Sequence, residues 1–156
     1  MMHRNFLNQA IELAIDNVNT GRGGPFGAII VKDNCVLSSS GNRVTSTLDP
    51  TAHAEILAIR LACQKLNDFQ LKDCVLYTSC EPCPMCLGAI YWSRLKKVYF
   101  ACSREDAAAA NFDDSYIYQE IAIPPSERSI VMKHIDLPTA NEPFNVWKKL
   151  SDKVLY

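Results

Sequence analysis

Apolar residues recur at helical spacing near the start of the chain. This spacing predicts a helix over about residues 4–19, with apolar positions at Phe6, Leu7, Ala10, Ile11, Ala14, Ile15 and Val18. The glycine-rich segment 21–25 interrupts the pattern and predicts a loop. Two apolar segments, 26–31 and 35–40, flank a polar turn and therefore predict a β-hairpin.

The middle of the chain alternates between helix-like and strand-like segments. Helical patterns cover about 49–66 and 82–93, and short apolar runs of strand type cover 74–78 and 97–101. Pro82 and Pro84 suit the first turn of the second helix. The alternation predicts an α/β fold with three layers (α/β/α), in which helices cover both faces of a mixed sheet of about five strands.

Further helices and one more strand are predicted in the last third of the chain. Helical segments are predicted at 105–110, 114–121 and 143–153, and a last strand is predicted at 130–135. The sequence contains no internal repeat and no linker long enough to divide it. A length of 156 residues fits one domain, so we expect a single domain over 1–156.

Composition narrows the class of protein. A hydrophobic content of 48% is ordinary for a globular protein. The formal net charge is −1, so nucleic acid is not an expected partner. No run of about 18 apolar residues is present, so no membrane span is expected. The first residues lack the apolar stretch of a signal peptide, and a cytoplasmic location is expected. In that compartment the seven cysteines stay reduced, and Cys35, Cys63, Cys74 and Cys102 are expected to be buried packing residues.

Two short motifs carry the candidate chemistry. They are Thr51-Ala52-His53-Ala54-Glu55 and Glu81-Pro82-Cys83-Pro84-Met85-Cys86. One imidazole and two thiolates give zinc three protein ligands, which leaves its fourth position for water. Cys83 and Cys86 share one face of a helical first turn, where the helix dipole favours negative sulfur. The motifs therefore predict a hydrolytic zinc site with Glu55 beside it to move protons.

Cys80 admits a second interpretation, because Cys80, Cys83 and Cys86 are spaced as in an iron–sulfur run. That run needs a further cysteine before a proline, and position 90 is Ile. Cys80 is therefore expected to be a buried residue at a strand end.

The spacing His-x-Glu followed by Pro-Cys-x-x-Cys is the signature of zinc nucleobase deaminases. Over nearly its whole length the chain resembles the cytidine deaminase-like superfamily, and more narrowly its bacterial guanine deaminases. The resemblance lies in Gly23-Gly24-Pro25-Phe26-Gly27-Ala28, Asp49-Pro50-Thr51-Ala52-His53-Ala54-Glu55, Cys80 to Trp92, Phe112-Asp113-Asp114 and Tyr156. The alanine-rich segment 107–110 is a departure, since it offers few polar groups for ribose or phosphate.

The resemblance implies an enzyme that hydrolyses guanine to xanthine and ammonia. It implies one zinc ion on His53, Cys83 and Cys86, with Glu55 as the proton shuttle. Hydroxide would add at C2 of the purine, and ammonia would leave after protonation of the amine.

The resemblance also assigns residues to the base. It implies that Asn42 hydrogen-bonds the base and that Phe26 and Trp92 shape an aromatic pocket. Asp114 would contact the purine and assist proton transfer. Tyr156 would close the site from the chain end, in its own or a neighbouring subunit, and a homodimer is expected.

Several alternatives stay open at this point. A tRNA adenosine deaminase shares the zinc site but would need a basic surface and room for a flipped nucleotide. A cytosine or guanosine deaminase, or a zinc-dependent scaffold without turnover, also fits the motifs. Release of ammonia would separate an enzyme from a scaffold.

Overall fold

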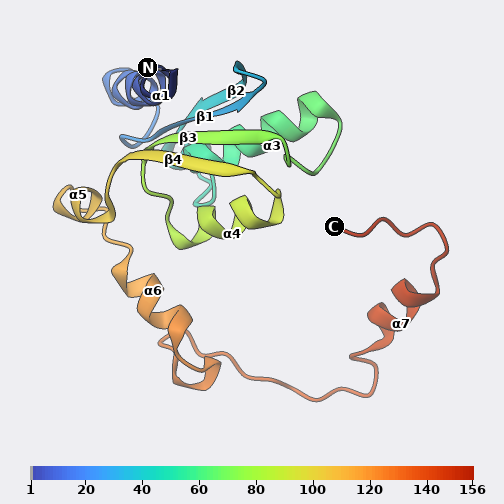
Figure 1. Cartoon of the computed structure of the whole chain (residues 1–156). Helices are drawn as coiled ribbons and strands as arrows, with labels where there is room; N and C mark the ends of the chain where they lie inside the picture. Colours follow the sequence, from blue (N-terminus) through green and yellow to red (C-terminus); the bar gives the residue numbers. More distant parts are fainter. Residues whose placement is uncertain (1) are drawn as a thin grey trace. The chain divides into compact units, whose positions relative to one another are not determined.

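The computed structural model describes residues 2–156 (Figure 1). The chain divides after Asp114 into two compact units, and the second unit is Ser115–Tyr156. Each unit is described by itself. The single domain expected over 1–156 therefore stays a prediction.

The first unit is organised around a four-stranded mixed sheet. Its strands, in spatial order, are β2 (Cys35–Gly41), β1 (Gly27–Lys32), β3 (Cys74–Cys80) and β4 (Lys97–Cys102). β1 runs antiparallel to β2 and β3, whereas β3 and β4 are parallel. The mixed sheet was predicted. The count of about five strands was wrong by one, because the described residues 130–135 form no strand.

Helices cover both faces of this sheet, which confirms the three-layer α/β/α arrangement (Figure 1). α1 (Met2–Asn19) lies on one face, where Phe6 packs against Ile29, Val31 and Tyr77. Gly27 lets the two elements approach closely, since a Cβ there would lie 2.3 Å from the Ala10 carbonyl oxygen.

α3 (Ala54–Leu66) and α4 (Pro84–Trp92) lie on the opposite face. Ala28, Ile30 and Leu76 of the sheet pack there with apolar side chains of both helices, including Ala58 and Ile90. Successive residues of β1 thus serve opposite faces, as the two-residue period of a strand requires. Burial of an Ile or Leu side chain stabilises the fold by about 1.5–3 kcal/mol.

The approach to α3 differs from the prediction. The helix begins at Ala54 rather than near residue 49, and a short helix, α2 (Val44–Thr47), precedes it. The Asp49 carboxylate accepts hydrogen bonds from the Thr51 backbone N–H at 2.8 Å and the Thr51 hydroxyl at 2.7 Å. This local turn competes with helix, which is the usual behaviour of Asp before a helix start. It places His53 at the N-cap of α3.

α5 (Arg104–Ala109) ends the regular structure of the first unit. Its start is a capping box, in which the Ser103 hydroxyl accepts from the Asp106 N–H while the Asp106 carboxylate accepts from the Ser103 N–H. The predicted helix at 105–110 is thus confirmed.

The cysteines divide by burial. Cys74 and Cys80 are buried, and Cys80 ends β3, as predicted. Cys35 and Cys102 are exposed, so the prediction that they pack in the core was wrong. Both lie on the outer strands of the sheet, whose side chains have fewer neighbours.

The second unit contains α6 (Ser115–Ala122), the 3-10 helix η1 (Pro125–Glu127) and α7 (Glu142–Lys149). The predicted strand at 130–135 was wrong, and the segment has no regular structure. A strand needs a partner for its backbone N–H and C=O groups, and this unit offers none among its described residues. Throughout residues 2–156, no helix is long and apolar enough to cross a membrane.

Candidate metal centre and base-binding site

The three predicted metal ligands lie at the first turns of two helices. His53 is the N-cap of α3 and Cys83 is the N-cap of α4, while Cys86 lies in the first turn of α4. Neither N-cap side chain makes a capping hydrogen bond. The imidazole and the thiol are therefore available to a metal ion, and both helix dipoles favour anionic ligands there.

The distances among these side chains match a tetrahedral zinc site. Cys83 Sγ and Cys86 Sγ each lie 3.5 Å from His53 Nδ1. Zinc bonds of about 2.0–2.3 Å at tetrahedral angles place a nitrogen and a sulfur ligand about 3.6 Å apart. Within residues 2–156, the cluster consists of His53, Cys83 and Cys86 without a fourth side chain. Three ligands fit a catalytic rather than a structural zinc site.

The protonation of the cluster also favours a cation. A hydrogen bond from Cys86 and, to a smaller extent, the imidazole of His53 together lower the pKa of the Cys83 thiol to about 4. The hydrogen bond with Cys83 in turn raises the pKa of His53. The pKa of Cys86 is raised because its thiol donates to Cys83 and is desolvated. The two sulfurs thus share one proton, which a bound zinc ion would displace.

Glu55 lies in the first turn of α3, two residues after His53, and is not a member of the ligand cluster. Its side chain is 5% exposed, and its Oε1 accepts a 3.4 Å hydrogen bond from the Thr78 hydroxyl. Burial raises the pKa of this carboxyl group. A buried carboxyl whose pKa is raised takes up a proton more readily than an exposed one, which suits a general acid–base.

Two residues assigned to the base, Phe26 and Asn42, lie close together near the C-terminal end of α1, where the Asn42 N–H donates to the Phe26 carbonyl oxygen at 3.0 Å. Phe26, just before β1, packs edge to face against Phe112 with ring centroids 4.9 Å apart. Asn42 follows β2 and is buried; its Oδ1 accepts hydrogen bonds from the N–H groups of Gly24 at 3.4 Å and Val44 at 3.1 Å. Because Oδ1 is occupied, the Nδ2 group is the part of Asn42 that can donate to a ligand.

The other three residues predicted to contact the base are Trp92, Asp114 and Tyr156. Trp92 ends α4 and is 63% exposed. Asp114 forms an ion pair with Arg104, whose Nε lies 3.2 Å from its Oδ1. Tyr156 belongs to the second unit, so its role at the site stays a prediction.

Sequence reasoning left some residues of this region unassigned. Phe112 was part of the resemblance but was given no role, and Arg104 was not considered. Asn17 was also missed. It continues the buried stripe Phe6, Ala10 and Ala14 of α1, so a polar residue on an apolar helix face was the available signal.

Comparison with protein families matches residues 1–102 to the cytidine and deoxycytidylate deaminase zinc-binding region. The chain belongs to this deaminase family. The match confirms the predicted superfamily and the zinc cofactor, since the matched region contains His53, Cys83 and Cys86.

Individual relatives show how far the likeness of this deaminase extends. It is 53% identical to the guanine deaminase of Bacillus subtilis (strain 168) over 156 residues, which is 100% of both chains. The crystal structure of the Bacillus subtilis guanine deaminase superposes with a TM-score of 0.98, covering 100% of this chain and 99% of that chain. The guanine deaminase of Nitrosomonas europaea is 34% identical with a TM-score of 0.67, covering 70% of this chain and 63% of that chain.

A relative with a different activity covers less of the chain. The tRNA-specific adenosine deaminase of Aquifex aeolicus is 51% identical over 77 residues, which is 49% of this chain and 51% of that protein. The likeness to that enzyme therefore extends over about half of each chain.

Proposed function

We propose that this chain catalyses the zinc-dependent hydrolysis of guanine to xanthine and ammonia. The observation that carries the proposal is the 53% identity with a guanine deaminase over the full length of both chains. The tRNA-specific adenosine deaminase of Aquifex aeolicus matches 49% of this chain, and this smaller coverage supports guanine over tRNA as the substrate.

The proposed mechanism assigns the proton transfers to Glu55. Zinc held by His53, Cys83 and Cys86 would lower the pKa of a bound water to about 7. Glu55 takes a proton from the attacking water and delivers it to N3 of guanine while the oxygen bonds to C2. Glu55 then carries the second proton from that oxygen to the exocyclic amine. The bond from C2 to the amine breaks, ammonia leaves, and C2 keeps a carbonyl oxygen.

The burial of Glu55 supports this role. A carboxyl group that is 5% exposed has no competing solvent, so the proton that it takes is retained for the substrate. The raised pKa favours the protonated form of the carboxyl group, which is the form that donates a proton. General acid–base catalysis of this kind contributes roughly 10²–10⁴-fold to a rate.

We further propose that the base lies between Phe26 and Trp92 with its edge against Asn42. The half-buried Phe26 ring and the available Nδ2 of Asn42 support this arrangement. Asp114 is proposed to contact the amino side of the purine. Its ion pair with Arg104 holds its carboxylate in one orientation.

We also propose a homodimer in which the second unit packs on another copy and Tyr156 closes a site. None of the residues 115–156 is buried, and large apolar side chains such as Phe144 (64% exposed) face outward from α7. A segment with that composition needs a partner surface. Zinc ligation requires reduced thiols, which supports a place in cytoplasmic purine metabolism.

A substrate panel tests the proposed activity. Purified protein would be supplied separately with guanine, cytosine, adenine, guanosine and tRNA, and released ammonia would be measured, with Glu55→Gln as the control variant. The proposal expects ammonia from guanine at a kcat/KM at least about 100-fold above the other substrates, since a site built for one set of polar groups rejects others strongly. Preferential release from tRNA, or no release at all, would contradict it.

A further inference from the structure

Asn17, near the C-terminal end of α1, is a buried polar side chain that the proposed chemistry does not use. It is 2% exposed, although it lies on a helix face whose other buried members are Phe6, Ala10 and Ala14. A polar side chain in such a place costs stability unless its hydrogen bonds are made. Its partners therefore indicate its role.

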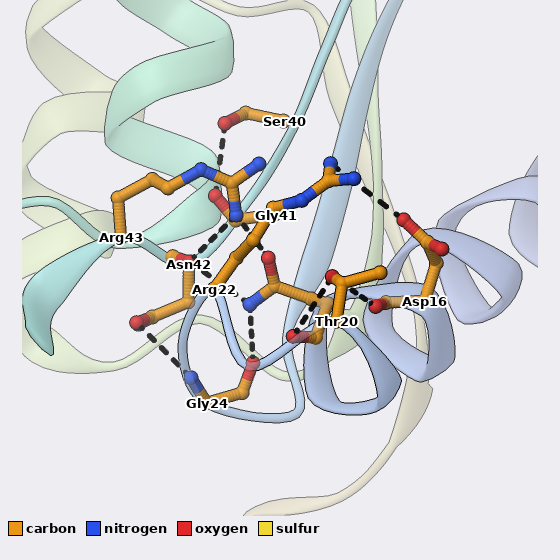
Figure 2. Close-up of polar contacts among 9 residues, drawn as sticks. Asp16, Thr20, Arg22, Gly24, Ser40, Gly41, Asn42 and Arg43 are labelled. Carbon is orange, nitrogen blue, oxygen red and sulfur yellow. Dashed lines mark hydrogen bonds and ion pairs between the residues drawn. The ribbon is translucent and has the colours of Figure 1, made fainter. Parts of the chain in front are cut away.

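The Asn17 amide bridges two separate backbone segments. Its Nδ2 donates to the Gly24 carbonyl oxygen at 2.8 Å and to the Asn42 carbonyl oxygen at 2.9 Å. Its Oδ1 accepts from Arg43 Nη1. Figure 2 shows Gly24, Asn42 and Arg43 gathered at the end of α1. Two carbonyls and one guanidinium allow a single orientation of the amide, with Nδ2 toward the carbonyls.

The two segments that Asn17 joins also contain the residues assigned to the base. The Gly24 oxygen accepts a second hydrogen bond, from the Phe26 N–H at 2.8 Å. The Asn42 N–H donates to the Phe26 oxygen at 3.0 Å, and the Asn42 side chain accepts from the Gly24 N–H at 3.4 Å. Phe26 and Asn42 are thus held in one hydrogen-bonded unit, and Asn17 connects that unit to α1.

Two glycines show how closely this unit is assembled. A Cβ on Gly41 would lie 2.5 Å from Asn17 Oδ1, and a Cβ on Gly23 would lie 2.3 Å from the Asn42 carbonyl oxygen. Both distances are shorter than real contacts. A side chain at position 41 would therefore displace the Asn17 amide, and one at position 23 would displace the Asn42 backbone.

We propose that Asn17 is a positioning residue, which sets the Asn42 amide and the Phe26 ring against the base and so determines the affinity for it. This inference rests on the proposed function. Asn17 is outside the metal cluster, and its side chain hydrogen-bonds to Gly24, Asn42 and Arg43. Its loss should therefore weaken base binding and leave the proton transfers intact.

The test compares matched substitutions on one helix. Asn17→Asp keeps the size and the acceptor for Arg43 but directs an oxygen at two carbonyls. Asn17→Ser removes the amide without adding charge, which serves if the Asp variant folds poorly. Asn8→Asp is the control, since Asn8 is exposed on the same helix. Zinc content, thermal midpoint, kcat and KM for guanine are measured for each.

We expect KM to rise about 10-fold to 100-fold in both Asn17 variants while kcat stays within about threefold, because the lost interaction acts on binding. Zinc content and the KM of Asn8→Asp should match the wild type. In an Asn42→Ala background, Asn17→Ser should add less than about threefold, because the positioned group is already absent.

Three results would overturn the inference. These are unchanged KM in both Asn17 variants, loss of zinc or of folded protein in both, and full multiplication of the two effects in the double variant. The last two would show a merely structural role. Absence of guanine turnover in both the wild type and Asn8→Asp would instead remove the proposed function, and this inference with it.

Discussion

The first unit positions its metal ligands and the residues proposed to contact the base in different ways. We call the region of His53, Cys83 and Cys86 the metal-binding end. His53, Cys83 and Cys86 are placed by the first turns of α3 and α4. Phe26 and Asn42 lie in irregular backbone, which is held in place by hydrogen bonds from the Asn17 side chain. These bonds reach Gly24, 7 residues away in sequence, and Asn42, 25 residues away. The metal ligands are thus positioned by helix termini, whereas the residues proposed to contact the base are held by hydrogen bonds from a buried amide.

This difference predicts that substitutions in the two regions change different kinetic constants. Changes at the helix termini should remove metal or lower kcat. Changes around Asn42 should raise KM.

The largest effect is expected from Cys86→Ala. Cys86 is completely buried, and removing its sulfur leaves zinc with two protein ligands. We expect zinc to be lost, turnover to fall below detection and the thermal midpoint to drop, since metal binding contributes to folding stability. Elemental analysis and thermal unfolding would check this. Cys35→Ala is the control, because Cys35 is exposed on β2; stoichiometric zinc in Cys86→Ala would refute the ligand assignment.

Glu55→Gln should separate metal binding from proton transfer. The amide keeps the size of the side chain but cannot take up a proton, so kcat should fall about 10²–10⁴-fold. Zinc content should stay at one per chain, and the KM for guanine should change little. Steady-state kinetics with metal analysis would measure both. Activity within a few-fold of the wild type would rule out Glu55 as the proton carrier.

Asn42→Ala should give the opposite kinetic pattern. It removes the Nδ2 donor proposed for the base and the acceptor for the Gly24 and Val44 N–H groups. We expect KM to rise about 10-fold or more with a smaller change in kcat, as for loss of a buried hydrogen bond. If kcat falls and KM stays constant, the division between the two regions is wrong.

The smallest effect is expected at the surface beside the metal-binding end. Arg60 and Asp49 form a 3.9 Å ion pair with side chains 55% and 38% exposed. Arg60→Ala should change the free energy of unfolding by about 0–1 kcal/mol, as is usual for exposed pairs. Chemical denaturation would measure it. A loss of zinc in this variant would show that the turn before His53 depends on the pair.

Features that depend on local sequence patterns could be predicted from the sequence. The metal centre was predicted because its ligands lie in two short motifs whose spacing reflects helix geometry. The sheet was predicted from local apolar patterns. The start of α3 was misplaced because the hydrogen bonds of Asp49 to Thr51 outweigh helix propensity there.

The remaining errors depend on contacts that local patterns do not contain. The apolar run 130–135 satisfies a strand pattern, but a strand forms only where another strand accepts its hydrogen bonds. The role of Asn17 depends on loops that reach it from elsewhere in the chain. Its position on an apolar helix face marks it as unusual without indicating its partners.

Removal of the metal and reconstitution with zinc would show whether this chain deaminates guanine only with zinc bound. Protein stripped of metal by a chelator would be given guanine before and after addition of one equivalent of zinc, and xanthine and ammonia would be measured together. We predict no product before addition, and equal amounts of xanthine and ammonia afterwards, in proportion to the zinc bound. Undiminished turnover in metal-free protein, or zinc uptake that restores no guanine deamination, would contradict the account.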